Sequence, residues 1–151
     1  MATKQVVGTE RRAEVTWHGD LTHGGGTIES VGSGAFAPLD VSWTSRAEEP
    51  GGKTSPEELI AAAHAACFAM ALSNGLGEAG HAPESISVAA TVTFVPGTGI
   101  TSSAIDVQGT VSGIDQSAFR QAANDAKDSC PVSKALKGNV ELLVTARLLE
   151  R

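Results

Sequence analysis

The two cysteines are the residues of this sequence with the most informative chemistry. Cys67 lies inside a run with a helical pattern, and Cys130 stands directly before Pro131. Two thiols that meet in space can cycle between a dithiol and a disulfide. In a reducing compartment such a bond is usually transient and catalytic or redox-sensing. A free cysteine is also often a small buried hydrophobic residue, so an inert role stays open for each of them.

The predicted surroundings of Cys67 oppose its ionisation. The thiolate is the reactive form, and burial in the middle of an alanine-rich helix raises the pKa of a thiol. A reactive Cys67 therefore needs a cation nearby. His64, three residues earlier on the same helix face, is one candidate, and Arg46 in the preceding loop is the other. His64 is equally well explained as a packed or hydrogen-bonded core histidine.

Glu57 provides a geometric argument about the same site. It precedes Cys67 by ten residues, which is about 15 Å along a helix axis, so the two side chains of one chain cannot meet. If Glu57 or Arg46 acts on Cys67, it comes from a second copy of the helix running antiparallel to the first. We therefore expect a symmetric homodimer. Alternatively, Glu57 is only a charge favourably placed in a first helical turn.

Cys130 is predicted to stand at the start of a short helix that opens with Pro131. Unpaired backbone N–H groups and the positive end of the helix dipole favour a thiolate or a good leaving thiol at that position. This environment is typical of a resolving cysteine, the thiol that closes a disulfide. The other interpretation is that the Cys-Pro step is merely a corner between two helices.

Composition and charge bound the class of protein. With 151 residues, 41% of them hydrophobic and 19% charged, the chain predicts a single globular domain over residues 1–151, with residues 1–10 as a flexible N-terminal extension. The net charge of −6 offers no basic footprint for nucleic acid. No signal peptide is evident and no uninterrupted apolar run reaches membrane-spanning length, so we expect a cytoplasmic protein without membrane contact. The glycines at 24–26 indicate a flexible hairpin connection, since no helix follows to form a phosphate loop.

The pattern of apolar residues predicts an α+β fold with an antiparallel sheet. A capping-box start at Ser55 and Pro56 predicts a long buried helix that ends near Leu76. The expected order is βββ-α-ββ-αα-β. Its further elements are strands near 13–18, 27–31 and 39–44, a hairpin of strands 85–94 and 103–111, helices from about 115 and from 131, and a final strand over 140–148.

Three segments, 17–21, 56–73 and 130–136, closely resemble the OsmC/Ohr family of thiol-dependent peroxidases, and most nearly its OsmC (osmotically inducible protein) branch. The resemblance implies an intertwined homodimer in which antiparallel sheets flank two long central helices. It also implies that Cys67 is the peroxidatic cysteine, Cys130 the resolving cysteine and Glu57 the glutamate that orients an arginine. Arg46 matches that arginine in one of the family's two arrangements, because residues 21–26 contain none.

The activity implied by the resemblance is reduction of organic hydroperoxides to alcohols, and of hydrogen peroxide more weakly. It would proceed through a Cys67 sulfenic acid and a Cys67–Cys130 disulfide, without a cofactor or metal, in defence against oxidative or osmotic stress. The implied partners are the hydroperoxide substrate and an external dithiol reductant, such as a lipoylated protein. An apolar pocket lined by Phe68, Met70 or the sheet residues would explain the preference for organic hydroperoxides, but the sequence does not locate it.

Two other functions remain open on the residues alone. One is a cysteine acyl-transfer enzyme that uses Cys67 with His64 as its base, although no residue to orient the imidazole is evident. The other is a non-catalytic structural or ligand-binding dimer with idle thiols. A metal site built from His64, Cys67 and Cys130 lacks closely spaced ligand pairs.

Overall fold

The computed structural model describes residues 8–150, which form two compact units, 8–55 and 56–150. Each unit contains its own three-stranded sheet. The predicted flexible extension over residues 1–10 falls mostly outside the described residues, and residues 8–10 carry no helix or strand. The assignment of the whole chain to a single domain stays a prediction.

The N-terminal unit is an antiparallel sheet followed by a short helix. Its strands lie in the order β1-β2-β3. The strand expected to run on to Thr44 stops earlier, because Ser42 and Ser45 form a capping box in which the Ser42 side chain accepts from the Ser45 backbone N–H at 3.0 Å. The elements are β1 Ala13–His18, β2 Gly25–Val31, β3 Leu39–Val41 and α1 Trp43–Ala47.

Two of the three consecutive glycines belong to strand β2 rather than to a flexible connection. Gly25 and Gly26 pair with His18 and Trp17 across the β1–β2 hairpin. A Cβ atom at Gly26 would lie 2.7 Å from Cε3 of Trp17, so glycine is needed there to let the indole pack on the strand. The hairpin was predicted correctly, but its glycines serve close packing.

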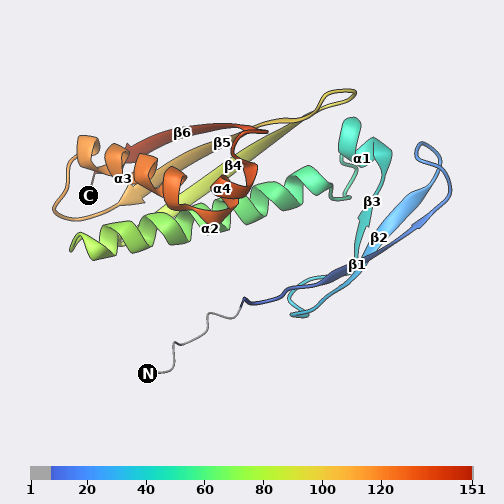
Figure 1. The fold of residues 1–151 in the computed structure, drawn as a ribbon, viewed down its shortest axis with the longest axis horizontal. Coiled ribbons are helices and arrows are strands. Elements are labelled where there is room, and N and C mark those ends of the chain that lie inside the picture. Colours follow the sequence, from blue (N-terminus) through green and yellow to red (C-terminus); the bar gives the residue numbers. More distant parts are fainter. Residues whose placement is uncertain (1–7, 151) are drawn as a thin grey trace, which may run out of the picture. The chain divides into compact units, whose positions relative to one another are not determined.

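The C-terminal unit covers one sheet with its helices (Figure 1). Strands lie in the order β4-β5-β6. Helix α2 packs against β4, α3 packs against β6, and the two helices contact each other, so they form a layer over the sheet. The elements are α2 Pro56–Glu78, β4 Ser85–Val95, β5 Gly99–Thr110, α3 Gln116–Ser129, α4 Pro131–Leu136 and β6 Glu141–Leu148.

The α+β fold class is confirmed, but this second sheet is mixed rather than antiparallel. Strands β4 and β5 form the expected antiparallel hairpin, closed by a bond from the Thr98 N–H to the Val95 carbonyl of 2.9 Å. Strands β5 and β6 pair in parallel. The connection between them contains α3 and α4, and a helical crossover of this kind returns the chain to the same end of the sheet.

Helix α2 has one buried stripe and one exposed face. From His64 onward the buried side chains follow a four-residue spacing. Phe68, Leu72 and Leu76 belong to the core cluster that also contains Ile105, Val107 and Phe119. Within α2, 22% of the most apolar 18-residue stretch is buried. By length and composition the helix is long and apolar enough to cross a membrane. Core helices of soluble proteins pass the same test, so this property alone does not place the protein in a bilayer.

Candidate active site

Cys67 and Cys130 lie beside each other in the C-terminal unit. Cys67 is in the middle of α2, and Cys130 separates α3 from α4. Cys130 belongs to the buried core cluster, Cys67 packs against that cluster, and each thiol influences the pKa of the other. Both cysteines are free. The structure therefore brings together the two cysteines that the sequence singled out.

The position of Cys130 follows from the proline after it. The residue before a proline avoids the helical conformation, and Cys130 has φ −64° and ψ 120°, which ends α3. Its N–H still donates to the Ala126 carbonyl at 2.8 Å, and its own carbonyl accepts from the Lys134 N–H at 3.0 Å. Cys130 thus closes one helix, opens the next and is 0% exposed. The corner between two helices is confirmed, and the role of Cys130 as a resolving cysteine stays a prediction.

Cys67 is held mainly in its neutral form by its surroundings. Burial raises the pKa of the Cys67 thiol, and the neighbouring Cys130 raises it further, while the backbone N–H of Val132 acts in the opposite direction. The net direction agrees with the expectation that a thiol in this helix needs a cation from elsewhere. Cys67 is nevertheless only half-buried, whereas Cys130 is fully buried.

Cys130 is shifted in the opposite direction. Burial alone would raise its pKa, but the backbone N–H of Ser133, the Cys67 thiol and the Ser133 side chain together hold the pKa of Cys130 below its usual range. No hydrogen bond of standard geometry joins the Cys130 sulfur to α4, so the N–H groups act on it as oriented dipoles. The prediction of a stabilised thiolate at this helix start agrees with this environment.

His64 is a hydrogen-bonded core histidine and not the cation for Cys67. It is 1% exposed, with Nδ1 2.6 Å from Ser103 Oγ and Nε2 2.8 Å from Ser133 Oγ. Burial lowers the pKa of His64, which favours the neutral ring. Both nitrogens are engaged by serines, so neither is available as the base of an acyl-transfer site at Cys67.

The sequence did not identify the two serines that hold His64. Ser133 had a local signal, because it follows Cys130 by three residues within the same short helix. Ser103 had none, since it lies on β5 and meets α2 only through the tertiary fold.

Glu57 and Arg46 are placed by the structure in different units. Glu57 is 6% exposed in the first turn of α2, and the uninterrupted helix keeps it about 15 Å from Cys67 along the axis, as expected. Arg46 is half-buried in the last turn of α1. The catalytic roles of both residues stay predictions.

Phe68 and Met70, two of the residues named for an apolar pocket, lie on different sides of α2. Phe68 is 0% exposed in the core, whereas Met70 is 72% exposed on the opposite side of α2 and borders an open hollow with Pro83 and Ile86. The helical spacing explains the difference, because residues two apart point to different sides.

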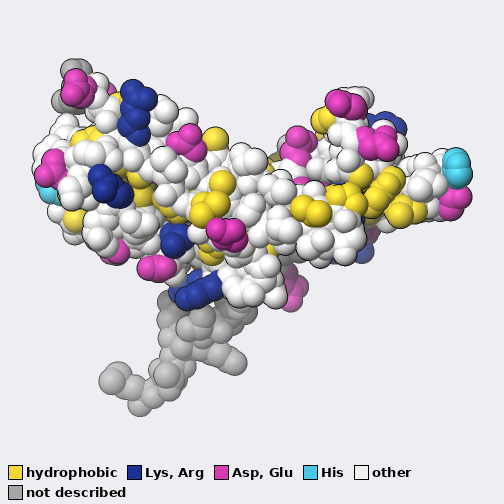
Figure 2. Space-filling view, turned by 90° about the horizontal axis from the view of Figure 1, so that it is seen from above, with side chains coloured by type: hydrophobic (Ala, Val, Ile, Leu, Met, Phe, Trp, Pro, Cys, Tyr) yellow, Lys and Arg dark blue, Asp and Glu magenta, His cyan; other side chains and the backbone are white. Residues whose placement is uncertain are grey.

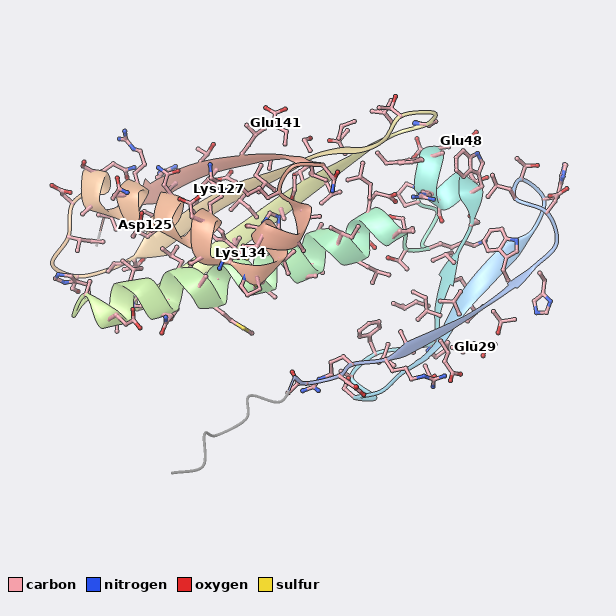
Figure 3. All side chains as sticks on the ribbon, in the orientation of Figure 1. Glu29, Glu48, Asp125, Lys127, Lys134 and Glu141 are labelled. Atoms are coloured by element: carbon pink, nitrogen blue, oxygen red, sulfur yellow. The ribbon has the colours of Figure 1, made fainter. Side chains whose placement is uncertain are left out.

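A cavity of about 320 Å³ borders the cysteine site at Ser133. Lys127 from α3 and Lys134 from α4 also line it, and Figure 3 shows both on these helices. On the face that Figure 2 shows, basic and acidic side chains of the described residues are interspersed. Within residues 8–150 no group of three histidine, cysteine or carboxylate side chains could hold a metal ion.

The family model described as OsmC-like protein matches residues 49–145. The chain belongs to the OsmC-like family. It is 43% identical over 135 residues to the peroxiredoxin OsmC of Escherichia coli strain K12, covering 87% of this chain and 93% of that protein. The resemblance drawn from the cysteine segments is therefore confirmed.

Solved structures of OsmC-like proteins share the fold. The organic hydroperoxide resistance protein OhrB of Bacillus subtilis matches with a TM-score of 0.62 and 26% identity, covering 89% of this chain and 97% of that one. The organic hydroperoxide resistance protein OsmC of Legionella pneumophila matches with a TM-score of 0.63 and 24% identity, covering 91% and 97%. The second likeness supports the fold alone.

Proposed function

We propose that this OsmC-like protein is a thiol-dependent peroxidase that reduces organic hydroperoxides to alcohols, and hydrogen peroxide more weakly. One observation carries the proposal: a half-buried Cys67 packs against the core cluster that contains the fully buried Cys130, and the pKa of Cys130 is lowered while that of Cys67 is raised. An accessible thiol beside a stabilised one is the arrangement that a peroxidatic and a resolving cysteine require. The relative with 43% identity is named a peroxiredoxin.

In the first step the Cys67 thiolate attacks the distal oxygen of the hydroperoxide. The sulfur–oxygen bond forms as the oxygen–oxygen bond breaks, and the departing alkoxide takes a proton to become the alcohol. Cys67 is left as a sulfenic acid. The peroxide enters at Cys67 because Cys130 is 0% exposed.

In the second step the Cys130 thiolate attacks the Cys67 sulfur. The disulfide forms as the sulfur–oxygen bond breaks, and the hydroxide that leaves combines with the proton that Cys130 had released, giving water. An external dithiol, such as the dihydrolipoyl group of a lipoylated protein, then reduces the disulfide. It attacks Cys67, the more exposed sulfur, so that Cys130 departs as the better leaving group.

Arg46, held by Glu57, supplies the cation that Cys67 lacks, and a second copy of the chain delivers it. The support for a homodimer is the outward face of α2, which carries exposed small and apolar side chains at helical spacing: Ala62, Ala63, Ala66 and Met70. A second α2 packed antiparallel on this face, with the two helices centred on each other near Ala62, would cover the alanines and would bring the start of one helix level with the middle of the other.

The setting proposed for this activity is the cytoplasm, in defence against oxidative or osmotic stress. The interspersed charges in Figure 2 and the net charge of −6 support a protein that does not bind nucleic acid. Glu57 and Glu58 in the first turn of α2 favour a protein partner over lipid at this end of the helix.

The test is to treat reduced protein with one equivalent of an organic hydroperoxide and to count free thiols. Wild type should lose both thiols, Cys67→Ser should consume no peroxide, and Cys130→Ser should give an overoxidised or intermolecular product. An unchanged rate of peroxide consumption in Cys67→Ser would overturn the proposal. Ester turnover without thiol loss would indicate acyl transfer, and neither activity would indicate idle thiols.

A further inference from the structure

The three lysines of the C-terminal unit all line one cavity. They are Lys127 in the last turn of α3, Lys134 in the last turn of α4 and Lys137 directly after α4. Residues 56–150 otherwise carry ten carboxylates and only two arginines, so this positive cluster does not follow from the composition of the unit. The peroxide-reducing steps make no use of it.

The corner at Cys130 gathers the lysines at one place. Cys130 ends α3 and begins α4, so Lys127 lies about one turn before it and Lys134 about one turn after it. The two helices contact each other, and Figure 3 shows Lys127 and Lys134 on them. At the start of β6, Val140 and Leu142 complete the cavity with apolar side chains.

The charges of these lysines are not neutralised within the described part of the chain. Among residues 8–150 no carboxylate forms an ion pair with any of the three ammonium groups, although Asp128 lines the same cavity. Lys134 and Lys137 are exposed, and Lys127 is half-buried. Like charges that share a small cavity repel one another. A group with several negative charges would therefore be attracted here and would also relieve the repulsion.

The cavity lies close to the cysteine site. Ser133 borders it, and the Ser133 hydroxyl oxygen is 2.8 Å from Nε2 of His64 on α2. His64 precedes Cys67 by three residues of the same helix, which is about 4.5 Å along the axis. A partner seated on the lysines would therefore stand beside the contact of α4 with α2, near the more exposed sulfur of the cysteine pair.

We propose that this lysine cavity is the docking site for an acidic segment of the protein that carries the reducing dithiol. Aspartate or glutamate side chains of the partner pair with the lysines, while its dihydrolipoyl group reaches Cys67 on a long flexible chain. Lysine suits this task, because a point charge on a flexible stem attracts carboxylates without requiring one fixed geometry. The inference deepens the proposed peroxidase function and rests on it for the disulfide that is reduced.

Docking promotes a thiol–disulfide exchange in two steps. One thiolate of the dihydrolipoyl group attacks the Cys67 sulfur, the bond between Cys67 and Cys130 breaks, and Cys130 leaves as a thiolate that takes up a proton. The second dihydrolipoyl thiolate then attacks the lipoyl sulfur bound to Cys67, which closes the lipoyl ring and releases Cys67 as a thiol. The dithiol loses two electrons and two protons, and the protein disulfide gains them.

The test uses two synthetic peptides that each carry a dihydrolipoyl amide on a lysine. They differ only in the flanking residues, which are glutamates in one peptide and glutamines in the other. The disulfide of the full chain is prepared with diamide, so that no peroxidase activity is needed. At low salt the acidic peptide should reduce wild type at least about tenfold faster than the neutral peptide, and about 0.5 M NaCl should remove most of this preference.

A matched pair of variants separates the cavity from net charge. The combined change Lys127→Gln, Lys134→Gln and Lys137→Gln should abolish the preference for the acidic peptide and leave reduction by dithiothreitol unchanged. The control removes three positive charges at exposed positions outside the cavity and should keep the preference; its changes are Arg11→Gln, Lys53→Gln and Arg120→Gln. If the change at the half-buried Lys127 unfolds the protein, the two exposed lysines alone should lower the preference when replaced.

Equal rates for the two peptides on wild type, or an equal loss of preference in the lysine variant and its control, would overturn the docking site. Failure of the peroxidase function gives a different result. A wild type that keeps both thiols after treatment with a hydroperoxide would contradict that function, whereas the diamide-oxidised protein would still report on docking by the lysines.

Discussion

The two cysteines are neighbours in space, yet they occupy opposite kinds of backbone. Cys67 lies inside an unbroken helix, whose backbone N–H groups are committed to the helical hydrogen bonds around it. Cys130 lies at a break between two helices, where the first N–H groups of α4 have no helical partner. Burial acts to raise the pKa of both thiols, but only Cys130 has groups that outweigh it, so the pKa of Cys67 rises and that of Cys130 falls.

A break between two helices can therefore stabilise the thiolate of Cys130, whereas the thiolate of Cys67 needs a cation. Cys130 is stabilised by the Ser133 backbone and side chain, which are local to its own segment. Cys67 has only the N–H of Val132 acting in its favour. An active Cys67 therefore depends on a charge brought from elsewhere, which is the role proposed for Arg46.

The largest effect on this comparison is expected from Arg46→Ala. Removing the cation should leave the Cys67 thiol protonated and slow its oxidation by an organic hydroperoxide about a hundredfold, while Arg46→Lys should lose less because it keeps the charge without the planar fork. The second-order rate constant of the first step measures this. Arg11→Ala is the control. The Arg11 side chain is exposed and donates a hydrogen bond to the carbonyl of the neighbouring Glu10. Equal losses in the two alanine variants would remove the special role of Arg46.

Ala66→Glu, on the outward face of α2, should slow the oxidation of Cys67 by as much as Arg46→Ala does, or by less. A carboxylate buried between two helices is costly, so this variant should turn the dimer into a monomer and slow the Cys67 step with it. Light scattering after size-exclusion chromatography measures the assembly.

The matched control for Ala66→Glu is Ala89→Glu. Ala89 is exposed on β4 and points away from the core, since its neighbours Val88 and Ala90 pack toward it. It should stay dimeric and active. A monomeric wild type, or an Ala66→Glu protein that remains a dimer, would show that this face is not the interface.

The smallest effect concerns stability on the Cys130 side of the site. Burial holds the pKa of His64 below its ordinary value of 6.5. As the pH falls, His64 is therefore protonated in the unfolded chain before it is protonated in the folded protein. The stability contributed by the neutral ring is complete above pH 6.5 and is lost as the pH falls below it, with a slope of at most about 1.4 kcal/mol per pH unit.

Urea unfolding of the reduced protein at a series of pH values checks this dependence. His64→Gln should be less stable at neutral pH but should show a flatter slope below pH 6.5, because it has no imidazole to protonate. Parallel slopes for wild type and His64→Gln would mean that the histidine takes a proton in the folded protein.

Much of this fold could be predicted because its signals are local. Pro56 and the acidic residues after it mark the start of α2, which begins at Pro56 as expected. Asp115 was expected to open α3, and its side chain accepts from the Ala118 N–H at 2.8 Å. The corner at Cys130 follows from Pro131 in the same way. Each of these features depends on residues within one helical turn.

What could not be predicted depends on contacts between distant segments. Strand β6 pairs in parallel with β5. The alternation of apolar and polar residues in β6 does not predict this, because it is the same for a parallel and an antiparallel strand. The bond from His64 to Ser103 joins α2 to β5, and no spacing along the chain indicates it. The sequence also did not indicate that Met70 would point outward. Because α2 is apolar on almost all sides, its pattern does not show which face is buried.

The most direct test of the peroxidase account is the mass of the wild-type protein after one equivalent of cumene hydroperoxide, followed by peptide mapping without reduction. The account predicts the loss of two hydrogen atoms and a crosslinked peptide pair containing Cys67 and Cys130. An unchanged mass, or oxygen added at Cys67 while Cys130 remains a free thiol, would contradict it.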